Sequence, residues 1–119
     1  MVTMTLQVPD DLARRIQPMA AWLPTVLELG LAKCRTRAAA AGVELIELLS
    51  RDPSPQEILD FHVSAAIQER SRRLLALNEA GLLGEEEQRE LDELDQLEHL
   101  VVMLKARVAR ELGEAPHGE

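Results

Sequence analysis

The sequence predicts a mainly α protein that begins with one short strand and ends in a helical hairpin. Three observations favour this fold. Residues 2–8 alternate apolar and polar side chains, the rest of the chain repeats apolar residues at three- and four-residue steps, and Gly or Pro interrupts that repeat at a few points. Alternation is the period of a strand and the longer repeat is that of a helix, so we expect only the first segment to be extended.

The composition allows one modest domain, or a small domain with a helical extension, in 119 residues. Trp22 and Phe61 are the only aromatic residues, which argues against a surface that stacks bases. Cys34 is the only cysteine, so neither an intrachain disulfide nor a cysteine-based zinc site can form. With no apolar run long enough for a membrane span and no secretory signal, we expect a cytoplasmic protein without membrane partners.

The net charge of −8 is unevenly distributed along the chain. Residues 1–42 carry five basic and three acidic side chains, whereas residues 43–119 carry eight basic and eighteen acidic ones. The chain therefore has a mildly basic head and a strongly acidic body, and only the head has the charge to approach nucleic acid.

The boundaries of the first elements are predicted from the positions of proline and aspartate residues. Pro9 ends the strand because it has no N–H to donate to a ladder. Asp10 favours the start of a helix, which Pro18 shortens. A second helix is expected over residues 23–36, with a proline in its first turn.

The second half of the chain is predicted to form three helices. The first is short and covers residues 43–49, and the sequence SRDPSP at 50–55 separates it from the second. Ser54 and Glu57 match a capping box, so the next helix should run from Pro55 to about residue 80. A turn follows, and the last helix should cover residues 85–112.

These last two helices should pack as an antiparallel hairpin, because only a short turn separates them. Its seam is predicted to consist of Leu59, Val63, Ile67, Leu74, Leu91, Leu94, Val101, Leu104 and Val108. The whole chain then divides into a head (1–42), a short helix and linker (43–54), the acidic hairpin (55–113) and a disordered tail (114–119).

An isolated strand needs a partner for its N–H and C=O groups, and the rest of the sequence offers no second strand. Two copies that pair their strands antiparallel would satisfy these groups, which predicts a homodimer. One face of the ribbon would cover the helices and the other could address base edges in a major groove. The covering face is Met4, Leu6 and Val8, and the base-facing residues are Thr3, Thr5 and Gln7.

The segments TMTLQV, PDDLARRI and LPTVLELGLAKCR, within residues 2–35, resemble the ribbon-helix-helix family of Arc- and MetJ-like repressors and bacterial antitoxins. The resemblance implies an intertwined dimer, a ribbon-helix-helix dimerisation unit followed here by the hairpin, that inserts its paired strands into double-stranded DNA. The remainder resembles small uncharacterised bacterial helical proteins and implies no activity. Candidate phosphate contacts are Arg14, Arg15, Leu23, Thr25 and Lys33, with Arg35 and Arg37 as further cations.

Two functions remain open at this point. One is an antitoxin-like, autoregulatory DNA-binding repressor whose helical body binds a partner. The other is a helical oligomerisation or adaptor protein that uses the strand only to dimerise. The acidic body could likewise mimic nucleic acid and bind a basic, toxin-like protein, or simply form a solvated face.

Nothing in the sequence indicates an enzyme, a cofactor or a metal site. His62 and His99 lack the Glu-x-x-His spacing of a di-iron helix pair. No nucleophile triad order and no glycine-rich phosphate loop is present. We therefore expect no catalytic and no metal-binding residues.

Overall fold

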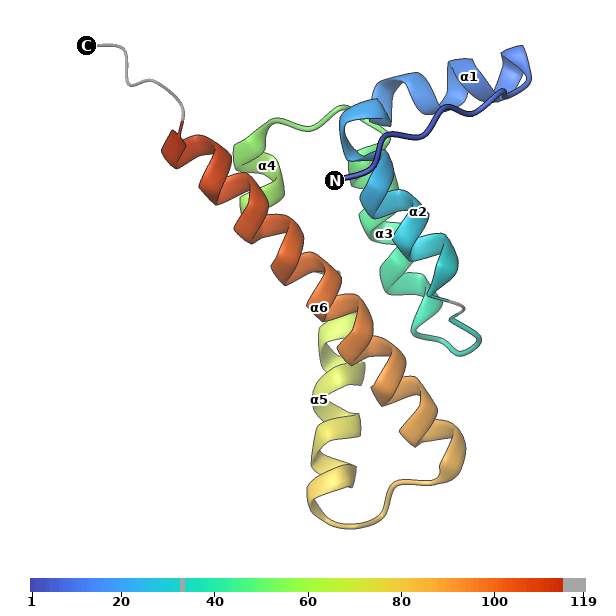
Figure 1. Cartoon of the computed structure of the whole chain (residues 1–119). Helices are drawn as coiled ribbons and strands as arrows, with labels where there is room; N and C mark the ends of the chain where they lie inside the picture. The colour runs from blue at the N-terminus through green and yellow to red at the C-terminus, as the bar shows by residue number, and fades with distance from the viewer. Residues whose placement is uncertain (33, 115–119) are drawn as a thin grey trace.

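A computed structural model describes residues 1–32 and 34–114 of the chain, and every regular element in these residues is helical (Figure 1). Six are α-helices and one, η1, is a 3₁₀ helix. In chain order they are α1 (Asp10–Ile16), η1 (Gln17–Trp22), α2 (Leu23–Leu31), α3 (Ala39–Leu49), α4 (Pro55–Leu59), α5 (Ala65–Glu79) and α6 (Glu85–Glu114).

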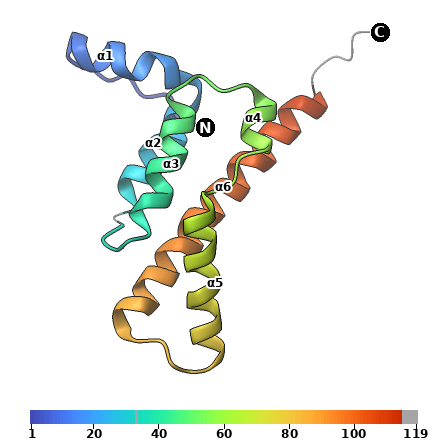
Figure 2. The same ribbon diagram turned by 180° about the vertical axis from the view of Figure 1, so that it is seen from behind.

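The long helix α6 is the element on which the others are assembled. It contacts α2, α3, α4 and α5, and Figures 1 and 2 show α2, α3 and α4 on one side of it and α5 on the other. The core combines residues of the predicted head with residues of the predicted hairpin. Its buried members are Trp22, Leu29, Ala38, Ala41, Leu45, Leu48, Leu49, Ile58, Leu97, Leu104 and Val108.

The predicted ribbon is wrong. Residues 1–9 contain no strand and precede α1 as an irregular segment, which runs back along α1 in Figure 1. The alternating pattern favours an extended backbone, but a ladder requires a second strand, and no segment of residues 1–32 and 34–114 forms one. The mainly helical prediction is confirmed, whereas the ribbon-helix-helix unit is overturned.

The side chains assigned to the ribbon accordingly lie in solvent. Met4 and Leu6, expected to be covered, are 80% and 64% exposed, and Val8 is half-buried. The three expected base-facing residues, Thr3, Thr5 and Gln7, are exposed on the same irregular segment. They line no paired surface in the described chain.

The helices differ from expectation where distant segments intervene. The helix expected from residue 55 to 80 stops at Leu59, because Phe61 and Val63 turn into the core. The Glu44 carboxylate on α3 then accepts a hydrogen bond from the backbone N–H of Ser64 at 2.7 Å, and α5 begins at the next residue. The helix expected to reach residue 36 ends at Leu31.

The chain is extended for its mass. Its accessible surface is 8768 Å², whereas a compact monomer of 13.2 kDa exposes about 6,400 Å². Its radius of gyration is 16.8 Å, against about 13.5 Å for a compact domain of this length. Much apolar surface therefore stays outside the core.

Candidate interaction surfaces

A groove lies between α3, α5 and α6 and encloses about 420 Å³. Its apolar floor comes from all three helices, and the loop after α4 contributes further lining residues. Small residues leave this space open, because Ala41 and Gly42 on α3 face it together with Ser71 on α5. The larger apolar residues of the groove are Leu45, Phe61, Val63, Ile67, Leu94, Leu97, Val101 and Val102.

Charges of both signs surround the groove. Arg72 and Lys105 lie among its lining residues, as do Asp95 and Glu98. The Lys105 ammonium donates a hydrogen bond to the backbone carbonyl of Phe61, which ties α6 to the loop after α4. With an apolar floor and a mixed rim, the groove is suited to an apolar side chain rather than to an anion.

A second surface is the solvent-facing side of α6. The residues at positions 92, 96, 99, 103, 106 and 110 are all exposed and follow one another at alternating steps of four and three residues. This spacing places them along one line of the helix, which we call the outer stripe. None of these six residues lines the groove, so the two surfaces occupy different sides of α6.

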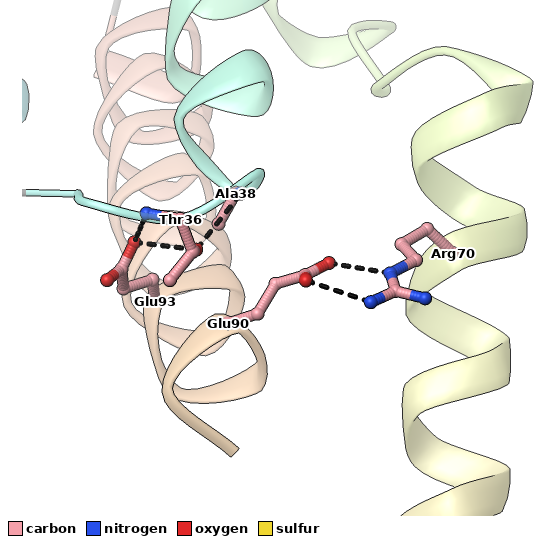
Figure 3. A network of polar contacts seen from close by, with 5 residues as sticks. All are labelled: Thr36, Ala38, Arg70, Glu90 and Glu93. Atoms are coloured by element: carbon pink, nitrogen blue, oxygen red, sulfur yellow. Dashed lines mark hydrogen bonds and ion pairs between the residues drawn. The ribbon is translucent and has the colours of Figure 1, made fainter. Parts of the chain in front are cut away.

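Glu93 anchors the connection between α2 and α3 to α6. Its Oε1 accepts hydrogen bonds from the backbone N–H of Arg35 at 2.9 Å, the backbone N–H of Thr36 at 3.1 Å and the Thr36 hydroxyl at 2.9 Å. Thr36 Oγ1 also accepts the N–H of Ala38, which positions the start of α3 (Figure 3). A carboxylate that is only 9% exposed is thus satisfied by the turn it holds.

Glu90, one turn earlier on α6, is paired with Arg70 on α5. The two carboxylate oxygens accept hydrogen bonds from Arg70 Nε at 2.8 Å and Nη2 at 3.0 Å, the paired geometry drawn in Figure 3. These hydrogen bonds lower the pKa of Glu90 and raise that of Arg70, while burial opposes both shifts. The pair fixes α5 against α6 as ions near neutral pH.

Trp22, the last residue of η1, lies under the guanidinium group of Arg107 on α6. The Arg107 guanidinium carbon is 5.7 Å from the centre of the indole ring, within the range of a cation–π contact. The buried indole Nε1 has no hydrogen-bond partner in the described residues. Packing and the overlying charge, rather than a hydrogen bond, therefore hold this ring.

Cys34 is half-buried beside the same carboxylate that holds Thr36. Burial raises the pKa of its thiol, and the negative charge of Glu93 raises it further. The thiolate is disfavoured at neutral pH, so this cysteine is not placed as a nucleophile.

The predicted phosphate contacts do not converge on a common site. Arg14 and Arg15 are exposed on α1, and Leu23 and Thr25 are half-buried. The Leu23 N–H donates to the Ala20 carbonyl because η1 runs directly into α2, so this amide is already occupied. Lys33 lies outside the described residues.

The predicted hairpin seam falls in the interior of the chain. Leu74, Leu91, Leu104 and Val108 are buried, and Leu59, Val63, Ile67, Leu94 and Val101 are half-buried. Four of these nine residues, Val63, Ile67, Leu94 and Val101, line the groove.

Sequence reasoning missed the two buried carboxylates. Glu90 and Glu93 precede Leu97 by seven and four residues, so both belong to the inward side of α6. An acidic side chain in register with a leucine stripe is the signal that could have identified them.

In the described part of the chain, no cluster of three or more His, Cys, Asp or Glu side chains is placed to hold a metal. Within the same residues, no helix combines the length and the apolar character required to cross a bilayer. No family model, no curated protein and no solved structure matches this chain.

Proposed function

We propose that this chain is a helical oligomerisation module that works as a homodimer. The observation that carries the proposal is the excess accessible surface, about 2,400 Å² above that of a compact monomer of the same mass. A protomer of an obligate dimer buries a surface of this order, roughly 1,000–2,500 Å². A second copy would therefore cover what the core leaves exposed.

The character of the exposed surface supports the same conclusion. Large apolar side chains protrude from α2, α3 and α6, and their contact with water is unfavourable unless a partner covers them. Those that are more than half exposed are Leu27, Leu31, Val43, Val102 and Met103.

The proposal keeps the predicted dimer but assigns it to helices instead of a ribbon. DNA-binding repression stays a prediction that no observation tests, and the ribbon that would carry it is missing from the described chain. In a dimer formed on the outer stripe, the groove of each copy would stay open, because no outer-stripe residue lines it. Such a module could present two equivalent grooves.

The test is the mass of the full-length protein in solution across a range of concentrations. Light scattering coupled to size exclusion, with sedimentation equilibrium for the dissociation constant, should give twice the chain mass at micromolar concentration. A mass of 13.2 kDa at every concentration up to the millimolar range would refute the proposal.

A further inference from the structure

The charge of α6 changes sign along its length. Residues 85–99 carry eight acidic side chains and one arginine, whereas residues 100–114 carry three basic side chains and two acidic ones. Two parallel copies of α6 would place the acidic halves side by side, at a high electrostatic cost. Antiparallel copies would place each acidic half beside the partner's basic half.

The outer stripe is self-complementary when the helix is reversed. A two-fold axis at residue 101 exchanges position 92 with 110, 96 with 106 and 99 with 103. Asp92 then faces Arg110 of the second copy, and His99 faces its Met103. All of these side chains are exposed in the single chain.

The centre of this arrangement is its least polar part. Met103 is 56% exposed and Ala106 is also exposed, so the axis would bring two copies of one small apolar patch together. The steps of four and three residues match the seam of a two-stranded coiled coil, in which such patches interdigitate. Asp92, the first residue of the outer stripe, already accepts a hydrogen bond from Gln88 on its own helix at 2.9 Å, which orients its carboxylate.

We infer that two copies of this chain associate through an antiparallel pair of α6 helices, with the axis at residue 101 and Asp92–Arg110 ion pairs at both ends. This inference rests on the proposed homodimer and specifies its interface. It also gives a role to the exposed charges of Asp92 and Arg110, which no contact between helices of the described chain uses.

Charge reversal gives the decisive experiment, because each substitution acts twice in a symmetric dimer. D92R would oppose two arginines and R110D would oppose two aspartates, so each should weaken dimerisation about tenfold. The double variant D92R/R110D restores opposite charges and should return the dissociation constant to within about threefold of the parent. Sedimentation equilibrium at low salt measures all three.

E79R and R73D are the matched controls, since they make the same changes of charge at exposed positions of α5. They should leave the dissociation constant of the dimer close to that of the parent. If D92R, R110D and the controls behave alike, or if the double variant fails to recover, the α6 interface is refuted. The proposed oligomerisation would still stand in that case, whereas a parent protein that is monomeric throughout would refute both.

Spin labels provide a geometric check that does not depend on charge. With the axis at residue 101, copies of one position separate by about 3 Å for each residue away from it, because an α-helix rises 1.5 Å per residue. Labels at R89C and A109C, each in a C34S background, should place their Cα atoms about 37 Å and 26 Å apart for an interaxial spacing near 9 Å. Short distances of about 10 Å at both positions would indicate parallel helices and overturn the inference.

Discussion

The two ends of the chain both carry a regular apolar pattern, with opposite results. In α6 the apolar residues belong to a helix that contacts four others, and even two carboxylates are buried there with hydrogen-bond partners. In residues 1–16 no side chain is buried, although the alternation before α1 is regular. Periodicity specifies which side of a segment could be buried, and only a partner segment decides whether it is.

The largest effect is expected from a substitution on the buried side of α6. Leu104→Ala removes a side chain that is 3% exposed and leaves a cavity in the hydrophobic core. We expect the free energy of unfolding to fall by about 2–5 kcal/mol. Urea denaturation followed by the fluorescence of Trp22, the sole tryptophan, measures this directly.

Glu90→Gln should rank second. The substitution keeps the shape of the side chain but leaves the Arg70 guanidinium facing a neutral amide, so we expect a loss of about 2–3 kcal/mol at pH 7. The same denaturation curve measures it, with Glu98→Gln as a control at an exposed position of the same helix. A loss below about 0.5 kcal/mol would show that the ion pair adds nothing to stability.

Acidification should act through the same pair. Because the folded pKa of Glu90 lies below its unfolded value near 4.5, its stabilising contribution is complete above pH 4.5 and disappears as the pH falls through the folded pKa. The parent protein should therefore lose more stability between pH 6 and pH 3 than Glu90→Gln does. Equal pH dependences in the two proteins would contradict this assignment.

Thr36→Val should have a smaller effect, because it removes only the hydroxyl from the network around Glu93. The backbone N–H groups of Arg35 and Thr36 still donate to that carboxylate, so we expect a loss of about 1 kcal/mol. Thermal unfolding should show a correspondingly lower midpoint. Glu93→Gln should cost more than Thr36→Val, and the reverse order would show that the carboxylate is not the anchor.

The smallest effect is expected at the first segment. Leu6→Ala changes an apolar residue that is 64% exposed, and the free energy of unfolding should change by less than about 0.5 kcal/mol. The difference between the losses in free energy of unfolding for Leu104→Ala and Leu6→Ala measures how differently the two ends of the chain are buried. A loss above about 1 kcal/mol at Leu6 would mean that this segment is covered in solution.

Local signals in the sequence were reliable where the determinant was local. The Ser54–Glu57 capping box is present at the start of α4, and a 3₁₀ helix containing Pro18 follows α1. Gly81 adopts φ of +71° at the end of α5, as its position after a long helix predicts. Each of these features depends on residues within one or two turns.

Features that depend on distant partners were not predictable in this way. The interruption after α4 requires Phe61 to enter the core, and the start of α5 uses Glu44 from α3. The burial of Glu93 requires a turn that lies 57 and 58 residues earlier in the chain. For the first segment, the pattern suggested a pairing that one chain cannot supply.

The dependence of α2, α3, α4 and α5 on α6 has a consequence for biosynthesis. Their contacts with α6 cannot form until α6 has left the ribosome, so these helices must wait in a partly exposed state until it has been synthesised. Premature termination before α6 would release a polypeptide with its leucines uncovered, a substrate for chaperones and proteases. We therefore expect a chain truncated before α6 to be degraded rather than to accumulate in a folded form.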